Sequence, residues 1–134
     1  MNNYAVHLLT RLVEIYSPSR KEEEISDFLV KEMENLGFHA WKDRVGNVIG
    51  EIGRGKSAIL LCGHMDTVAG YIPVRVEDNK LYGRGAVDAK ASLAAMIIAS
   101  HILAKERLSN RILVVGVVDE EGSGRGIKHL VKEE

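Results

Sequence analysis

The sequence has little of what marks a secreted or membrane protein. It contains one cysteine, Cys62, which has no second cysteine with which to form an intramolecular disulfide. No apolar run approaches the roughly 20 residues that a membrane-spanning helix needs. The first residues, MNNYAVHLLTRLVEIY, lack the basic and continuous apolar regions of a secretory signal. We therefore expect a cytoplasmic protein that has no membrane partner.

An excess of charge of one sign is also missing. The 18 Lys and Arg residues balance 19 Asp and Glu residues, and no expected helix face gathers a basic cluster. Nucleic acid is therefore not an expected partner, and a small molecule or an acidic-to-neutral partner fits better. Apolar residues make up 46% of the 134-residue chain, which is enough for the core of one domain or of part of a larger one.

The periodicity of apolar residues predicts a mixed α/β fold. Ser19 and Glu22 match a capping box at the start of the second expected helix. The apolar runs at 58–62 and 112–118 indicate buried strands, the first covered on both faces, joined by a parallel crossover. Helices are expected over 4–16, from the capping box to residue 36, over 91–105 and from 125 onward, with strands over 38–42, 47–52, 58–62 and 112–118 and a hairpin within 70–85.

One segment matches a nucleotide-binding pattern. Gly50 to Ser57, GEIGRGKS, satisfies G-x-x-x-x-G-K-[ST], the phosphate-binding loop. That loop needs a helix that starts at its Lys-Ser, whereas Ser57 opens the expected strand SAILLCG. A glycine-rich turn between two strands explains the segment without a ligand. A nucleotide-binding domain remains an alternative, but the less favoured one.

His64 and Asp66 follow the first apolar run, with Met65 between them. In an extended segment, residues two apart face the same way, so the Asp66 carboxylate can hold the His64 ring. A metal-ligating histidine commonly has such a partner. For this pair alone, a surface histidine and aspartate in a loop is an equally good interpretation.

Further acidic residues favour the metal interpretation. Asp88 precedes the expected helix at 91–105, while Glu120 and Glu121 follow the second apolar strand. Taken singly, Asp88 is more simply a helix N-cap, and the two glutamates part of a solvated turn. Ligand sites of parallel α/β sheets lie beyond the carboxyl ends of strands, however, which predicts that His64 and the glutamates meet. One imidazole with several carboxylates suits zinc or a similar ion better than magnesium.

Three segments together resemble a known family. GHMDTV, LYGRGAVDAK and VVDEEGSG occur in the order and spacing of the zinc-dependent co-catalytic aminoacylase and exopeptidase family, which includes acetylornithine deacetylase and succinyl-diaminopimelate desuccinylase. The resemblance covers Gly63 to Gly124. It implies a three-layer αβα catalytic domain with a mixed, mostly parallel sheet, and a site for two Zn²⁺ or Co²⁺ ions.

The resemblance also assigns a role to each candidate residue. His64 and Glu121 would each bind one ion, and Asp88 would bridge the two. Glu120 would be the general acid/base, and Asp66 would orient His64. It implies amide hydrolysis in which Glu120 takes a proton from water and returns it to the leaving amine.

Within that family, GYIPVRVEDNKLYGRGAVDAK is most similar to the branch that releases lysine or ornithine from an amino-group carrier protein in lysine and arginine biosynthesis. The expected partner is therefore that carrier protein or a small N-acyl amino acid. The chain departs from the branch at Ala69, where proline is common, and at Ala91, where glycine is usual. Neither is a ligand position in the family.

The main difference between this sequence and the family is its length. Members of the family are several hundred residues long and take one further carboxylate and one further histidine from sequence beyond the paired glutamates. Residues 1–134 are therefore expected to form the N-terminal part of a catalytic domain, without its C-terminal part or the lid and dimerisation domain. The expected complete protein is a homodimer, and the chain alone is expected to be inactive. A non-catalytic metal-binding domain is the other alternative.

Overall fold

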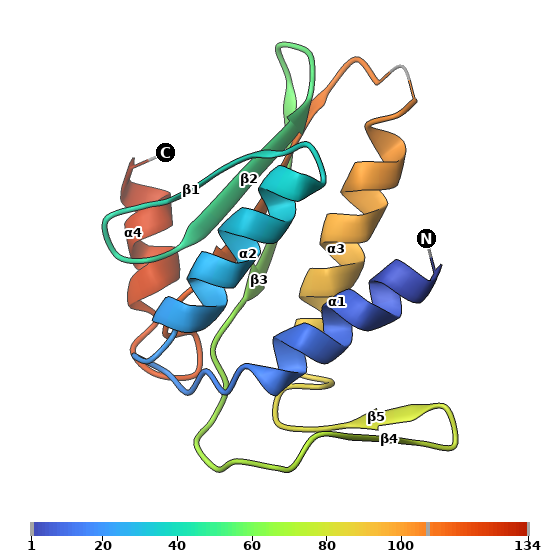
Figure 1. Cartoon of the computed structure of the whole chain (residues 1–134). Coiled ribbons are helices and arrows are strands. Elements are labelled where there is room, and N and C mark those ends of the chain that lie inside the picture. The colour runs from blue at the N-terminus through green and yellow to red at the C-terminus, as the bar shows by residue number, and fades with distance from the viewer. Residues whose placement is uncertain (1, 107, 134) are drawn as a thin grey trace.

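A four-stranded sheet between helices forms the centre of the computed structural model, which describes residues 2–106 and 108–133 (Figure 1). The helices and strands expected from the periodicity are all found, with ends shifted by a few residues. The helices are α1 (Asn2–Glu14), α2 (Glu23–Asn35), α3 (Lys90–Leu103) and α4 (Arg125–Glu133). The main sheet contains β1 (His39–Lys42), β2 (Val48–Gly53), β3 (Ala58–His64) and β6 (Arg111–Val117), and β4 (Arg75–Glu77) and β5 (Lys80–Tyr82) form the hairpin.

The sheet is mixed, in the order β1-β2-β6-β3. β3 and β6 are parallel, which confirms the crossover through α3, whereas β1 with β2 and β2 with β6 are antiparallel. By strand direction, β1, β6 and β3 run the same way and β2 runs opposite to them, so the sheet of the described residues is mixed and mostly parallel, as expected. In the parallel pair His64 lies opposite Val117, so both strands end at the same edge of the sheet.

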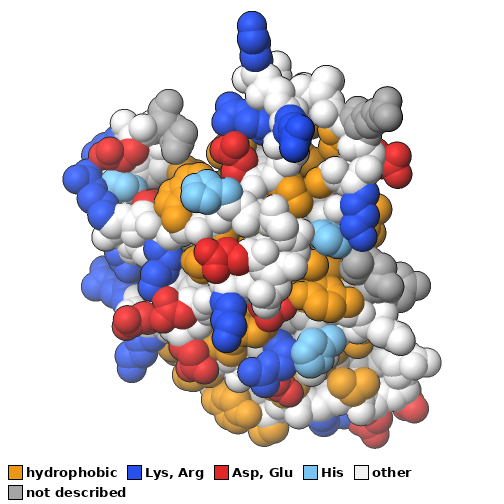
Figure 2. Space-filling view, turned by 45° about the horizontal axis from the view of Figure 1, so that its top comes forward, with side chains coloured by type: hydrophobic (Ala, Val, Ile, Leu, Met, Phe, Trp, Pro, Cys, Tyr) orange, Lys and Arg blue, Asp and Glu red, His pale blue; other side chains and the backbone are white. Residues whose placement is uncertain are grey.

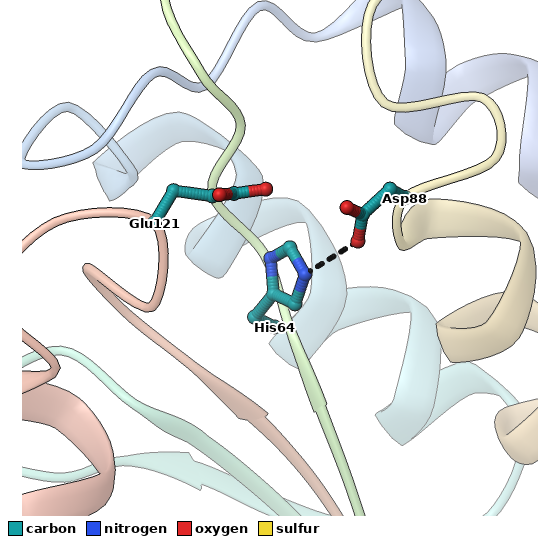
Figure 3. A group of neighbouring side chains, drawn as sticks. All are labelled: His64, Asp88 and Glu121. Carbon is teal, nitrogen blue, oxygen red and sulfur yellow. Dashed lines mark hydrogen bonds and ion pairs between the residues drawn. The ribbon is translucent and has the colours of Figure 1, made fainter.

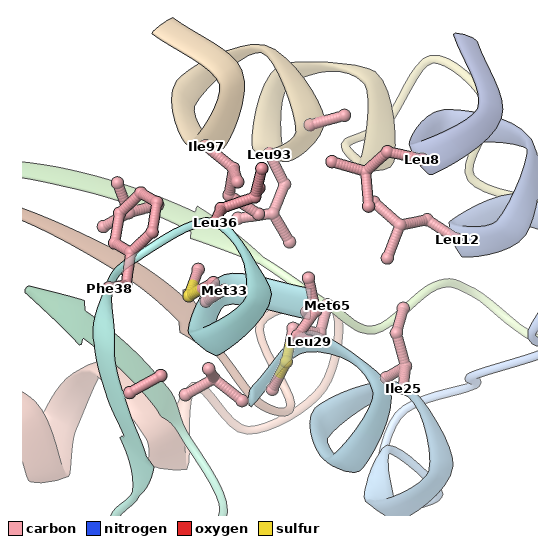
Figure 4. Close-up of a cluster of buried hydrophobic side chains, with 14 of the residues drawn as sticks. Leu8, Leu12, Ile25, Leu29, Met33, Leu36, Phe38, Met65, Leu93 and Ile97 are labelled. Atoms are coloured by element: carbon pink, nitrogen blue, oxygen red, sulfur yellow. The ribbon is translucent and has the colours of Figure 1, made fainter. Parts of the chain in front are cut away.

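Helices cover both faces of this sheet, as expected for three layers (Figure 1). One face packs against α1, α2 and α3, and Figure 4 shows side chains from all three helices meeting over it. The opposite face packs Ile49, Val115 and Val117 against Leu130 of α4. The central strand β6 is therefore buried on both sides. The largest fully buried apolar side chains are Leu8, Leu12, Ile25, Leu29, Met33, Met65, Leu93, Ile97, Val48, Val114 and Val115.

The expectation that β3 is covered on both faces is wrong. Ile59 and Leu60 are 48% and 57% exposed. Within the described residues β3 is the last strand of the sheet, and only its C-terminal end, at His64, is buried. An apolar run is compatible with a central or a terminal strand, because strand order depends on pairing partners far away in the sequence.

The glycine-rich segment before β3 forms a turn. β2 ends at Gly53, β3 begins at Ala58, and no helix starts at Lys56 or Ser57. Gly55 has a φ of +133°, and a Cβ there would lie 1.8 Å from the backbone oxygen of Ser109. The glycines therefore allow a close approach between backbones, and the phosphate-loop interpretation is not favoured.

The surface shows no large area of a single charge on the face in Figure 2, where Lys and Arg side chains lie among Asp and Glu side chains. This mixture agrees with the net charge of −1. None of the helices in the described part of the chain has the length and apolar content to cross a membrane.

The burial of the core residues predicts how much a substitution there lowers the free energy of unfolding. Leu29 of α2 is 0% exposed, so Leu29→Ala should lower the free energy of unfolding by about 2–5 kcal/mol, through lost apolar contacts and the cavity that remains. Val6→Ala on the exposed side of α1 should change it by less than about 0.5 kcal/mol. Urea unfolding followed by circular dichroism measures both. Equal effects of the two substitutions would contradict the assignment of the core.

Candidate metal centre

His64 ends β3 with its ring almost fully buried and both nitrogens engaged. Nδ1 lies 2.8 Å from the backbone oxygen of Asp66 and donates its hydrogen there. Nε2 faces away from the sheet and lies 3.0 Å from Oδ1 of Asp88 (Figure 3). The strand end therefore presents Nε2 to the carboxylates that follow the neighbouring elements.

Asp88 and Glu121 complete a group with His64. Asp88 comes just before α3 and Glu121 follows β6, and one ligand atom from each residue lies within 4.8 Å of those of the other two. Among the residues that the structure describes, no other set of three such side chains comes this close. One imidazole nitrogen and two carboxylate oxygens match the donors that zinc takes in catalytic sites, so the residues present fit one such ion.

Asp88 does not cap α3. The residue at the N-cap position is Ala89, and no side-chain hydrogen bond caps the helix. The Asp88 side chain is 75% exposed, and within residues 2–106 and 108–133 it makes a hydrogen bond to His64 alone. The simpler N-cap interpretation is therefore wrong, because the tertiary neighbour His64 takes the carboxylate.

Asp66 is fully buried, and its carboxylate serves mainly the neighbouring turn. Its two oxygens accept hydrogen bonds from the backbone N–H groups of Glu120 and Glu121, each at 3.0 Å, and from the Ser19 hydroxyl. The contact of a carboxylate oxygen with His64 Nδ1 is longer, 3.4 Å. It is the Asp66 carbonyl that makes the short bond to the ring.

Glu120 lies beside the group without belonging to it. Its Oε2 is 3.6 Å from His64 Nε2, and its side chain is half exposed. Glu121, next along the chain, is in the group. The two adjacent glutamates therefore have different surroundings, which is the requirement for one to bind an ion while the other handles protons.

Two further residues were not expected at this site. Ser19 and Glu22 match a capping box, but α2 has no side-chain cap bond. Ser19 instead bonds to Asp66, and buried Glu22 accepts hydrogen bonds from backbone N–H groups of Arg20 and Asp119. The capping prediction is wrong because both side chains have partners from distant segments.

The site strongly perturbs the pKa values of His64 and Asp66. The interaction with Asp66 raises the pKa of His64 to about 9, with a further contribution from Asp88 and against the effect of burial. Burial alone would raise the pKa of Asp66, but bonds from His64, Ser19 and the following backbone lower it to about 2. At neutral pH and without a metal ion, a pKa of about 9 makes His64 an imidazolium, bound by the Asp66 carbonyl and the Asp88 carboxylate.

The raised pKa of Glu121 shows that negative charges are crowded in this site. Desolvation and the carboxylates of Asp88 and Glu120 raise the pKa of Glu121. A cation bound among these groups would remove the repulsion and would take the place of the proton between His64 Nε2 and Asp88. The charges of the site therefore favour a metal ion as well as its geometry does.

The His64 pKa predicts how stability depends on pH in chelator-treated protein. The pKa of His64 is raised from 6.5 to about 9 in the folded state, so its contribution is complete below pH 6.5 and is lost as the pH rises through 9. Between those values, the free energy of unfolding of the wild type should fall by about 2–3 kcal/mol more than that of His64→Gln. Urea titrations at pH 6 and pH 9.5 measure the difference, and parallel profiles would contradict it.

The fold is that of peptidase catalytic domains. Aminopeptidase PepT from Bacillus cereus superposes with a TM-score of 0.83 at 27% identity, covering 99% of this chain and 40% of that one. A tripeptidase from Staphylococcus aureus gives 0.82 at 26% identity, again over 99% of this chain and 40% of the other.

The particular family follows from the sequence comparison. The model of peptidase family M20/M25/M40 matches residues 60–134, and the chain belongs to this family. A relative in Pyrococcus furiosus, named putative [LysW]-lysine/[LysW]-ornithine hydrolase, is 52% identical over 93% of this chain and 37% of its own length. The [LysW]-lysine hydrolase of Deinococcus radiodurans is 42% identical over 96% of this chain and 36% of its own. The chain thus spans little more than a third of the length of these curated relatives.

Proposed function

We propose that this chain supplies the metal-binding part of the active site of a hydrolase that releases lysine or ornithine from an amino-group carrier protein. The observation that carries the proposal is the convergence of His64 Nε2, Asp88 and Glu121 within 4.8 Å, with Glu120 beside them. The names of the curated relatives support the substrate class. A cytoplasmic location is part of the same proposal.

The metal in this proposal is zinc or cobalt. His64 and Glu121 would each hold one of two ions, and Asp88 would bridge them. The YXEP protein of Bacillus subtilis, described as a dinuclear metal-binding peptidase of the M20 family, shares the fold at a TM-score of 0.70 and 16% identity. When bound, such ions polarise a carbonyl group and lower the pKa of water.

The protein's own groups would carry out the proton transfers. Glu120 accepts a proton from the attacking water and later donates it to the leaving amine, the role of a general acid/base. Its partial exposure lets the carboxylate reach a substrate. His64 is held in one orientation by the bond from Nδ1 to the Asp66 carbonyl, which leaves Nε2 free for a ligand.

A cleft leads away from Asp88 and Glu121. Its volume is about 570 Å³, and Val68, Ile72 and Val87 are among its apolar lining residues. We assign the aliphatic part of the released amino acid to this cleft, because apolar side chains line it together with the carboxylates that would face the scissile carbonyl. Val68→Asp, which places a charge in this lining, should then raise KM for the carrier-linked substrate.

The complete protein would be longer than this chain. Residues 1–134 would form the N-terminal part of a catalytic domain, and the complete protein would be a homodimer. The share of 36–37% of the relatives' lengths that this chain spans supports the first of these two points, since it is what part of a longer protein would cover. The additional ligands for two ions would come from outside the described residues.

The test compares this chain with a chimera in which it replaces the matching segment of the Pyrococcus furiosus relative. We expect the zinc-loaded chimera to release free lysine or ornithine from the carrier protein. The 134-residue chain alone should show no turnover, because the further ligands proposed for two ions would be absent from it. Amino-acid analysis of the products measures release, with N-acetylornithine as the small-molecule comparison. A well-folded, zinc-loaded chimera that cleaves neither substrate would refute the proposed function.

A further inference from the structure

Three successive backbone N–H groups after β6 are bound by two buried carboxylates. Asp66 binds those of Glu120 and Glu121, each at 3.0 Å. The N–H of Asp119 donates instead to Oε1 of Glu22, at 2.9 Å. Because the side chains of Glu120 and Glu121 extend from this backbone, the two carboxylates help to fix where the paired glutamates lie.

Glu22 belongs to a segment far from this turn in sequence. It lies in the connection between α1 and α2, is 4% exposed, and its bond to Asp119 joins residues 97 positions apart. The same oxygen accepts the N–H of Arg20 at 2.8 Å. Burying a carboxylate is costly unless hydrogen bonds replace its water, and here two backbone donors do so. No capping bond to α2 accounts for its burial.

Both donors to Glu22 sit in an unusual backbone conformation. Arg20 has a φ of 72° and Asp119 a φ of 57°, in the left-handed region that favours glycine. Such conformations in non-glycine residues cost about 1–3 kcal/mol each and persist where the surroundings impose them. The Glu22 carboxylate joins the two strained positions, so it is part of what holds them.

The same connection also binds the end of β3. The Ser17 hydroxyl donates to the Met65 carbonyl at 2.8 Å, and backbone bonds join Ser17 and Ser19 to Thr67 at 2.9 and 3.1 Å. The Ser19 hydroxyl donates to Asp66. Residues 17–22, which we call the brace, therefore contact the segment after His64 and the segment before Glu120, and join the two strand ends that carry the site (Figure 1).

We propose that Glu22 is a positioning residue for the metal site, acting through the backbone of Asp119 to fix the carboxylates of Glu120 and Glu121. This inference rests on the proposed metal-binding function. Glu22 would touch neither metal nor substrate. Its effect would be to limit movement of the acidic turn relative to His64, because loss of the bond frees the Asp119 N–H, which lies between the Val118 N–H bound by Asn47 and the two N–H groups bound by Asp66.

Substitutions at Glu22 separate this role from a general effect on folding. Glu22→Gln keeps an oxygen that can accept both N–H groups, and Glu22→Met removes it at similar size. Glu23→Met is the matched control, since Glu23 is the exposed neighbour at the start of α2. The rate of amide hydrogen exchange at Asp119 and Glu121, measured by NMR on the metal-free chain, shows how firmly the brace holds this turn. The amide of the buried residue Leu29 serves as the reference.

We expect Glu22→Met to speed exchange at Asp119 by about tenfold or more without a matching change at Leu29. Zinc affinity should fall by about 10–100-fold, the usual effect of losing an outer support of a ligand, and the visible spectrum of the cobalt form should change. Glu22→Gln should stay within about threefold of wild type in both measurements. Glu23→Met should match wild type throughout.

Unchanged Asp119 exchange in folded Glu22→Met, or unchanged zinc affinity there, would overturn the proposal. If Glu22→Met does not fold, Glu22→Asp replaces it as the test, because its shorter side chain cannot reach both N–H donors. Faster exchange confined to Asp119 in this variant would support the positioning role of Glu22, and unchanged exchange would overturn it. Wild-type protein that binds no zinc would instead refute the proposed function. In that event the exchange measurement still decides whether Glu22 holds the turn.

Discussion

His64→Ala should reduce the zinc affinity of this chain by at least about a hundredfold, more than is usual for loss of an outer support. His64 offers the one imidazole nitrogen of the group, and Asp88 and Glu121 would remain as two exposed carboxylates with weak preference for zinc. Isothermal calorimetry at pH 7.5 measures the change. Proton release should accompany binding in the wild type, because the metal displaces a proton from His64, whose pKa is about 9.

The control for this experiment is His7→Ala, which removes an exposed imidazole on α1. It should leave zinc affinity and proton release unchanged. If His64→Ala binds zinc as tightly as His7→Ala does, the ion lies elsewhere and the assignment of the site fails.

The second large effect that we expect distinguishes the roles of Glu120 and Glu121. In the chimera with the Pyrococcus furiosus relative, Glu120→Gln should keep its zinc but lose about a hundredfold or more in kcat, because an amide cannot accept the proton of the attacking water. Glu121→Gln should instead weaken zinc binding, since it changes a carboxylate of the metal-holding group. Metal content of the dialysed proteins and steady-state kinetics distinguish the two variants.

The opposite pattern, with metal lost in Glu120→Gln and retained in Glu121→Gln, would exchange the roles of the two residues. Near-normal turnover by Glu120→Gln would remove the general base from the mechanism. Both outcomes are visible without knowing the natural acyl group, because each compares a variant with its parent on one substrate.

The sequence predicts the elements well because their signals are local. The helix α2, the strand β6 and the hairpin within residues 70–85 each follow from the residue pattern of a short window. Strand order, in contrast, cannot be predicted from such local signals. Nothing within Ala58–His64 shows that β3 would be the last strand among the described residues, since that depends on which segments pair with it.

The meeting of His64 with the paired glutamates was predictable for a topological reason, whereas the role of Asp88 came from the family resemblance. A parallel pair of strands ends at one edge, so His64 and the glutamates after β6 had to meet there. Glu22 gave no such signal. It lies in the charged run Lys21 to Glu24, where a solvated helix start is the natural interpretation, and its partner Asp119 is 97 residues away. The match to a capping box was misleading, because tertiary partners outweighed a local rule.

The most direct test of the central claim is anomalous diffraction at the zinc absorption edge from crystals of the zinc-loaded protein. We expect a peak at bonding distance, about 2.0–2.2 Å, from His64 Nε2 and from a carboxylate oxygen of Asp88, with Glu121 at a second ion and Glu120 outside the coordination sphere. A peak elsewhere, such as between His129 and Asp43, which lie 3.8 Å apart, would contradict it. So would fully occupied zinc that leaves the bond between His64 and Asp88 intact.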